Sequence, residues 1–206
     1  MKTLLLVLAL ILTVGRPAIA EISAPPPLIA RAAGAPVEAD GKLDEAIWKA
    51  WTQDPSGAAA SWRRIAKPSE PSSDQRTAYF AYDANFLYVA LVVRYGDHVP
   101  ADAETSGAPD SIRLDFDGFA LGIHSDGTQI SDIILPYVIP IQKGVTETDD
   151  GWSAEIAVQW SQLQMIPTAG MKIHFNIAGR DASGPISWAP VKDVRDVKNF
   201  GVLELR

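Results

Sequence analysis

Short segments in which apolar and polar residues alternate recur along the sequence, and they constrain the fold more than any other feature. In residues 110–117 every second side chain is apolar, and residues 152–158 and 172–177 repeat the pattern. Residues 201–205 form a further short segment of this kind at the end of the chain. Successive side chains of a strand point to opposite faces of a sheet, so this period predicts β-strands with one apolar face.

Two neighbouring segments, 77–83 and 86–93, meet at a tight turn and predict a β-hairpin. The second segment is apolar throughout, as in a strand that is covered on both faces. One short helix precedes the hairpin, because four apolar residues recur there at helical spacing. These residues are Leu43, Ile47, Trp48 and Trp51. Together the segments predict an all-β fold, an antiparallel β-sandwich of the jelly-roll type with one short N-terminal helix.

Residues 1–20 predict a signal peptide. Lys2 precedes an apolar run from Leu4 to Val14, and Ala18-Ile19-Ala20 has the small residues that signal peptidase requires. The run is too short to cross the roughly 30 Å of hydrocarbon in a bilayer. We therefore expect cleavage of this segment, no membrane attachment afterwards, and a periplasmic or secreted protein.

The remaining chain predicts one domain behind a short lead-in. Residues 21–35 contain three consecutive prolines and several alanines, which is typical of an extended tether outside the core. The folded domain is expected over residues 36–206. The formal net charge is −7 and no cluster of basic residues occurs, so binding to nucleic acid is not expected. The sequence contains no cysteine, which excludes disulfides and thiolate chemistry.

The search for catalytic residues gives no strong candidate. His124, Ser125 and Asp126 are consecutive, so they cannot form a catalytic relay, and Ser-Asp-Gly is a common turn. Asp115 and Glu155 lie on polar strand faces, but glycoside hydrolysis needs two carboxylates across one cleft. Solvated strand faces carry such acids routinely. We therefore expect a binding protein and not an enzyme.

A haem site is an alternative on the same architecture. Met165, Met171 and His174 lie close together in sequence and belong to the residue types that act as axial ligands. The simpler interpretation is that the methionines fill gaps in the core and that His174 flanks a strand. A haem-binding electron-transfer domain therefore stays open as a second function.

The order of the motifs resembles family 9 carbohydrate-binding modules and the wider group of DOMON-like sandwiches. The opening segment 37–48 contains a D-G turn and an L-D-E-x-x-W helix, and four later groups follow in family order. These groups are 82–90, 110–117, 151–157, and 175–177 with 180–181, 187–188 and 200–203. The resemblance implies a β-sandwich that binds oligo- or polysaccharides, often beside a glycoside hydrolase. It also implies structural calcium ions in the loops, and related sandwiches carry haem.

The sequence departs from the family at the sugar site that the resemblance implies. The two family tryptophans fall near residues 107–109 and 194–195, where no aromatic residue stands. The family glutamate aligns with Arg113, and a sugar-contacting arginine aligns near Gly122. The sugar itself therefore does not transfer, and a structural or interaction domain without a sugar site is a third alternative.

Six residues are candidates for a ligand site. Arg113 and Asp115 are expected on one strand face, His124 on the next strand, and Arg195 in the loop that normally supplies an aromatic residue. We hypothesise that Arg113 and Arg195 face an acidic ligand such as a uronic-acid sugar, because guanidinium groups match carboxylates. The alternative is that Arg113 only pairs with Asp115.

Trp62 and Trp188 are candidates for stacking on a sugar ring, with a core position as the alternative for each. Asp110, Asp181 and Asp193 could supply oxygen ligands to a cation, but the sequence has no dense carboxylate loop, so no metal ligand is assigned.

Overall fold

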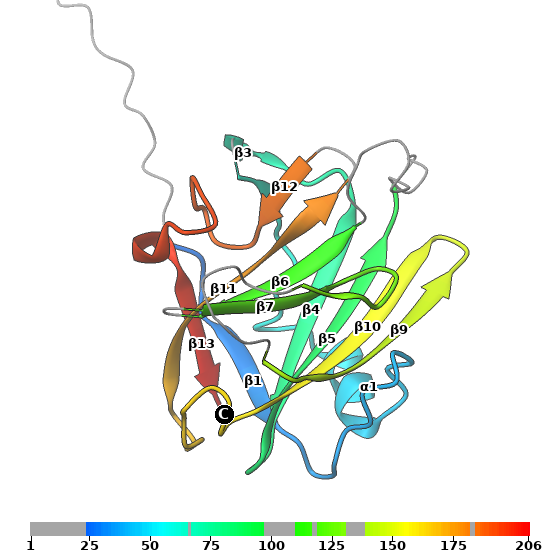
Figure 1. The fold of residues 1–206 in the computed structure, drawn as a ribbon, viewed down its shortest axis with the longest axis vertical. Coiled ribbons are helices and arrows are strands. Elements are labelled where there is room, and N and C mark those ends of the chain that lie inside the picture. The colour runs from blue at the N-terminus through cyan, green and yellow to red at the C-terminus, as the bar shows by residue number, and fades with distance from the viewer. Residues whose placement is uncertain (1–23, 66, 97–109, 117–118, 131–138, 182–183) are drawn as a thin grey trace, which may run out of the picture.

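The computed structural model describes residues 24–65, 67–96, 110–116, 119–130, 139–181 and 184–206. The predicted signal peptide lies outside these ranges. The described part forms strands, one α-helix and one 3-10 helix (Figure 1). The strands are β1 (Leu28–Ala32), β2 (Arg63–Arg64), β3 (Lys67–Pro71), β4 (Gln75–Tyr82), β5 (Phe86–Arg94), β6 (Ser111–Phe116), β7 (Phe119–His124), β8 (Gln129–Ile130), β9 (Gln142–Thr148), β10 (Gly151–Gln159), β11 (Lys172–Asp181), β12 (Gly184–Ser187) and β13 (Gly201–Leu205), and the helices are α1 (Ala46–Gln53) and η1 (Val197–Asn199).

The strands form the two layers of a β-sandwich (Figure 1). The first layer has the order β1-β4-β5-β10-β9, and the second has the order β12-β11-β6-β7. β13 pairs with β1 and also with β11, so it connects the layers at one side. Among the described strands every pairing is antiparallel except the two made by β1. The all-β sandwich is therefore confirmed, with a mixed sheet in place of a purely antiparallel one.

The predicted alternation places one apolar row of each layer in a shared core. Phe80 of β4, Leu114 of β6 and Phe175 of β11 belong to this core and are fully buried. The rings of Phe80 and Phe175 meet edge to face, with centroids 5.6 Å apart. Burial of such apolar surface, at about 25 cal/mol per Å², is the main force that holds the two layers together.

The helix α1 covers the outer face of the first layer (Figure 1). Trp48 and Trp51 are buried there, as predicted, and the Trp51 indole N–H donates to the Phe80 carbonyl at 2.9 Å. The helix begins at Ala46 and not at Leu43, which has a φ of 56° and lies in the preceding turn. Within the described ranges, no helix has the length and apolar character needed to span a membrane.

Part of the predicted lead-in belongs to the core. Residues 28–32 form β1, in which Leu28 and Ala30 are buried. β1 lies between β13 and β4 and is parallel to both. The Arg206 N–H donates to the Ala30 carbonyl at 2.8 Å, so this strand is tied to the last residue of the chain. The proline-rich composition of residues 21–35 concealed a five-residue strand, and the prediction of a tether was wrong for 28–32.

Candidate functional site

The outer face of the second layer carries three of the predicted site residues. Arg113 and Asp115 alternate with the core residues of β6, so their side chains lie on its outer face. His124 ends β7 and stands opposite Ser111 of β6. The structure thus brings Arg113, Asp115 and His124 onto one face. The strand pattern predicted this for Arg113 and Asp115, and the register of β7 adds His124.

A buried polar network holds Arg113 in place. The Arg113 Nε–H donates to Asp115 Oδ1, and the Asn176 amide donates to Asp115 Oδ2 at 3.3 Å. The Ser187 hydroxyl donates to Asn176 Oδ1 at 2.9 Å. Asp115 is 1% exposed, so the prediction that it lies on a solvated face was wrong. The pairing of Arg113 with Asp115 was foreseen, and it fixes the direction of a guanidinium whose side chain stays 25% exposed.

The structure shows why the arginine implied by the family resemblance is absent. A Cβ atom at Gly122 would lie 2.2 Å from the Ile112 carbonyl oxygen, so no side chain fits there. Residues 107–109, where a family tryptophan would stand, lie outside the described residues. Arg195 is exposed in the loop before η1, and its backbone N–H donates to Asp193 Oδ1 at 2.8 Å. The structure does not bring Arg195 into the network of Arg113.

The two tryptophan candidates are core residues. Trp62 and Trp188 are each 4% exposed. The Trp62 indole N–H donates to the Ala59 carbonyl at 3.0 Å, and the Trp188 ring lies so close to Gly201 that a Cβ there would be 2.3 Å from it. Neither ring presents a face to solvent, so the interpretation of both as stacking platforms was wrong.

A hollow of about 500 Å³ opens beside Trp62, between residues 60–63 and 69–77. Its wall includes the polar residues Ser61, Ser72 and Asp74. Because Trp62 shows only 4% of its surface, the hollow offers hydrogen-bonding groups but no open aromatic face.

A buried arginine, Arg76, also lines this hollow, and the sequence did not indicate it. Arg76 is 2% exposed and points toward the interior of the sandwich. Its Nη2 lies 3.2 Å from Asp74 Oδ2 and 3.6 Å from Asp110 Oδ2. Nη2 also donates to the Arg180 carbonyl at 2.9 Å, and Nη1 donates to the Ser111 carbonyl at 3.3 Å. One guanidinium therefore connects the starts of β4 and β6 with the end of β11.

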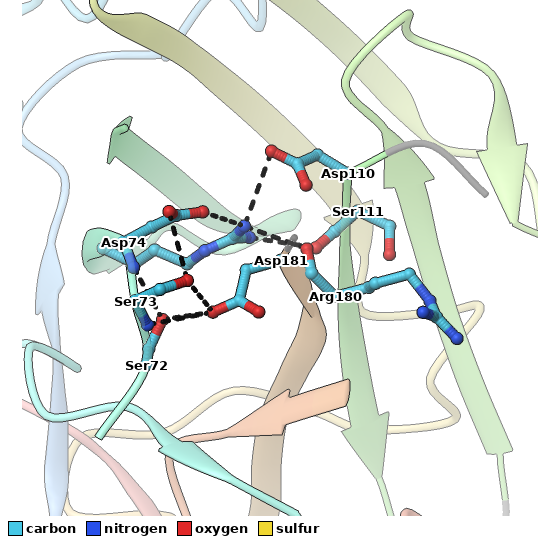
Figure 2. Close-up of polar contacts among 8 residues, drawn as sticks. Ser72, Ser73, Asp74, Asp110, Ser111, Arg180 and Asp181 are labelled. Carbon is cyan, nitrogen blue, oxygen red and sulfur yellow. Dashed lines mark hydrogen bonds and ion pairs between the residues drawn. The ribbon is translucent and has the colours of Figure 1, made fainter. Parts of the chain in front are cut away.

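We call Asp74, Arg76, Asp110 and Asp181 the Arg76 cluster. Asp181 accepts hydrogen bonds from the Ser72 and Ser73 hydroxyls at 2.8 and 3.0 Å. Burial raises the pKa of Asp110, Arg76 opposes this shift, and Asp74 adds to it. Asp181 raises it as well, so the three carboxylates of the cluster lie close enough to repel one another (Figure 2).

The Arg76 cluster does not suit the structural calcium that the family resemblance implies. Arg76 stands between Asp74 and Asp110, where a second cation would be repelled. Within the described residues no group of three or more acidic or histidine side chains is arranged to hold a metal ion. Asp193 is engaged with the Arg195 backbone instead of joining Asp110 and Asp181.

Glu155, the other acid assigned to a polar strand face, is buried beneath α1. It is 1% exposed and accepts hydrogen bonds from the Gly41 N–H at 2.7 Å and the Trp48 indole at 2.6 Å. Burial, with Glu45 as an additional cause, raises the pKa of Glu155 to about 7. Asp115 belongs to the opposite outer face of the sandwich. The two acids therefore cannot flank one cleft, as glycoside hydrolysis requires.

The residues proposed for haem do not converge. Met165 and Met171 pack against the core between the layers. His174 lies on the outer face of β11, where its ring centroid is 5.6 Å from that of Phe200. An axial pair needs two side chains on one axis, and these residues point to different sides of the second layer.

Solved structures match this fold over most of its length. A family 9 carbohydrate-binding module from Caldicellulosiruptor kristjanssonii in complex with glucose matches with a TM-score of 0.63 and 18% identity, over 88% of this chain and 96% of that one. Its complex with cellotriose gives the same TM-score and identity over 88% and 94%. The chain has the fold of family 9 carbohydrate-binding modules.

A candidate carbohydrate-binding protein from Bacteroides uniformis matches the same fold more distantly. Its TM-score is 0.55 with 11% identity, over 87% of this chain and 98% of that one. No family model matches the chain, and no curated protein matches it either. The family 9 likeness therefore lies in the path of the backbone, and the residues of the outer face differ from those that the resemblance implied.

Proposed function

We propose that this protein is a non-catalytic carbohydrate-binding domain that acts in the periplasm or outside the cell. It would recognise oligo- or polysaccharides and assist a glycoside hydrolase in their breakdown. Two observations support the proposal: the fold is shared with modules solved in complex with glucose and cellotriose, and the N-terminal sequence has the features of an export signal.

The observation that carries the proposal is the rigid polar surface around Arg113. A sugar offers hydroxyl groups that must meet fixed donors and acceptors, and binding is stronger when those groups are already in place. Asp115, Asn176 and Ser187 hold the Arg113 guanidinium from below through buried hydrogen bonds. The partly exposed guanidinium is then the main polar contact for a ligand on this face.

Binding of the whole chain to a panel of neutral and charged oligosaccharides, measured by calorimetry, tests the proposal. Arg113→Gln should lower the affinity for the best ligand about tenfold, because a charged hydrogen bond contributes roughly 1.5–3 kcal/mol. Thermal melting shows whether the variant stays folded.

Ser61→Trp is the matched control, since an indole at this exposed position would fill the hollow beside Trp62 without touching the outer face of β6. Its affinity should equal that of the wild type. If only this variant loses affinity, the sugar binds in the hollow. If the wild type binds no glycan, the alternative of a structural or interaction domain is favoured, and a Soret band in the visible spectrum would favour haem.

A further inference from the structure

The side chains of Arg113, Arg180 and His124 carry nitrogen atoms and surround one small area on the outer face of the second layer. Arg180 of β11, Ser111 of β6 and His124 of β7 stand directly opposite one another in the strand register. Neighbouring strands are about 4.8 Å apart, so Arg180 and His124 are separated by about 10 Å, with Ser111 between them. Arg113 lies on the same face, about 6–7 Å further along β6.

The residues between these side chains are small. Arg113 stands between Ala178 of β11 and Gly122 of β7 in the register. Because the Ile112 carbonyl excludes any Cβ at Gly122, that position leaves the face open beside Arg113. Ser111, Ala178 and Gly122 thus form a low floor, while the longer side chains of Arg113, Arg180 and His124 stand around it.

Arg180 differs from the other partly buried arginines. Arg31, Arg64, Arg76 and Arg113 each lie within 4 Å of a carboxylate. In the described part of the chain the Arg180 side chain has no hydrogen bond or ion pair, although it is partly buried. Figure 2 shows its side chain directed away from Asp74 and Asp181.

His124 adds a second unsatisfied group beside the same floor. Its Nδ1 is buried and has no hydrogen-bond partner in the described structure. Buried polar atoms are normally paired, so two groups without a described partner on one small face indicate that this face takes a polar ligand. An anionic group that lies on the floor is within reach of the long Arg180 side chain, with the imidazole of His124 at its other edge.

We infer that this face binds negatively charged sugars, with the oxyanion of a uronic acid or of a sulfated sugar held between Arg180, His124 and Arg113. The inference rests on the proposed function and names the class of carbohydrate. Guanidinium groups suit such oxyanions because their N–H donors form a planar fork. The whole chain carries a net charge of −7, so the positive charge that would attract such a sugar is confined to this face.

Calorimetry with three ligands tests the inference: a neutral cello-oligosaccharide, a galacturonate oligosaccharide of equal length and a sulfated oligosaccharide. The wild type should bind at least one charged ligand about tenfold more tightly than the neutral one. Arg180→Gln should remove this preference and change the neutral affinity less than twofold. The preference should also shrink in about 1 M salt, where the screening length falls to roughly 3 Å.

Arg195→Gln is the matched control, because Arg195 is an exposed arginine in the loop before η1. It should keep the preference, and a loss in this variant alone would overturn the assignment to Arg180. Tight binding of only one charged ligand identifies the oxyanion as carboxylate or sulfate. Binding of neutral sugar without any preference for charge overturns the inference and leaves the proposed function standing, whereas binding of no ligand overturns both.

Discussion

Arg76→Met should lower the free energy of unfolding at pH 7 by about 3–5 kcal/mol, the cost of breaking a buried ion pair by removing one partner. Methionine fills much of the same volume, so the loss is electrostatic. Without the guanidinium, Asp74 and Asp110 face each other at 7% and 3% exposure with no cation between them. The carbonyls of Ser111 and Arg180 lose their donor as well. Urea unfolding measures the change.

The loss should depend on pH in a defined direction. Removal of Arg76 takes away the cation that opposes the raised pKa of Asp110, so this carboxyl becomes protonated more readily. The loss in free energy of unfolding caused by Arg76→Met is therefore larger at pH 8 than at pH 5. Adding Asp110→Asn to the variant should recover part of the stability at pH 8, because one buried charge disappears.

Arg206→Met is the control for the Arg76 cluster. Arg206 pairs with Glu204 at 2.8 Å, but its side chain is 61% exposed. Exposed pairs contribute only about 0–1 kcal/mol. A deficit for Arg76→Met that is no larger than that of Arg206→Met would show that the Arg76 cluster does not hold this end of the sandwich together.

The free energy of unfolding should fall by about 3 kcal/mol as the pH rises from about 4.5 to above 7, owing to Glu155 alone. The pKa of Glu155 is about 7 in the folded protein and 4.5 as the ordinary value. Between these values the folded state binds more protons than the unfolded state, so this contribution is full below pH 4.5 and is lost through pH 7. Urea unfolding over this range measures the slope.

Glu45→Gln isolates the contribution of Glu45 to the raised pKa of Glu155. The amide keeps an oxygen for the Glu38 N–H, which donates to Glu45 Oε1 at 3.0 Å, and it places a donor where Glu45 Oε2 is buried without a partner. The repulsion between two carboxylates is thereby removed, so the variant should lose less stability than the wild type between pH 5 and 8. Glu147→Gln, at an exposed position of β9, should leave the slope unchanged. Equal slopes in all three proteins would contradict the assigned role of Glu45.

The alternating pattern was sufficient to predict the layers but not the polar interior. Leu114 and Phe175 were assigned correctly because a period of two residues determines the face of a strand. Arg76 occupies an inward position of β4, two residues before Ala78, but the strand was predicted to begin only at Thr77. A charged residue in an apolar row was the available signal, and its partners Asp110, Ser111 and Arg180 come from distant segments.

The candidate site was predicted in part for the same reason. The alternation of side chains along the strand placed Arg113 and Asp115 on one face. It could not show that Asp115 is covered, because coverage depends on tertiary contacts with Asn176. Arg180 was overlooked because its strand was expected to end at Ile177. Trp62 and Trp188 were candidates for an exposed site, but both are buried. Residue type alone does not separate a ligand platform from a core residue.

The parallel pairing of β1 links the earliest and latest strands of the described chain. Residues 28–32 emerge before the other described strands during synthesis, but one of their two neighbours is β13, which ends at Leu205. Until that last strand arrives, the facing edges of β4 and β13 cannot both be satisfied, and open edges invite association with other chains. Pairing over such a sequence distance also closes slowly. We therefore expect the sandwich to become complete only after β13 has been synthesised, with β1 among the last strands to dock.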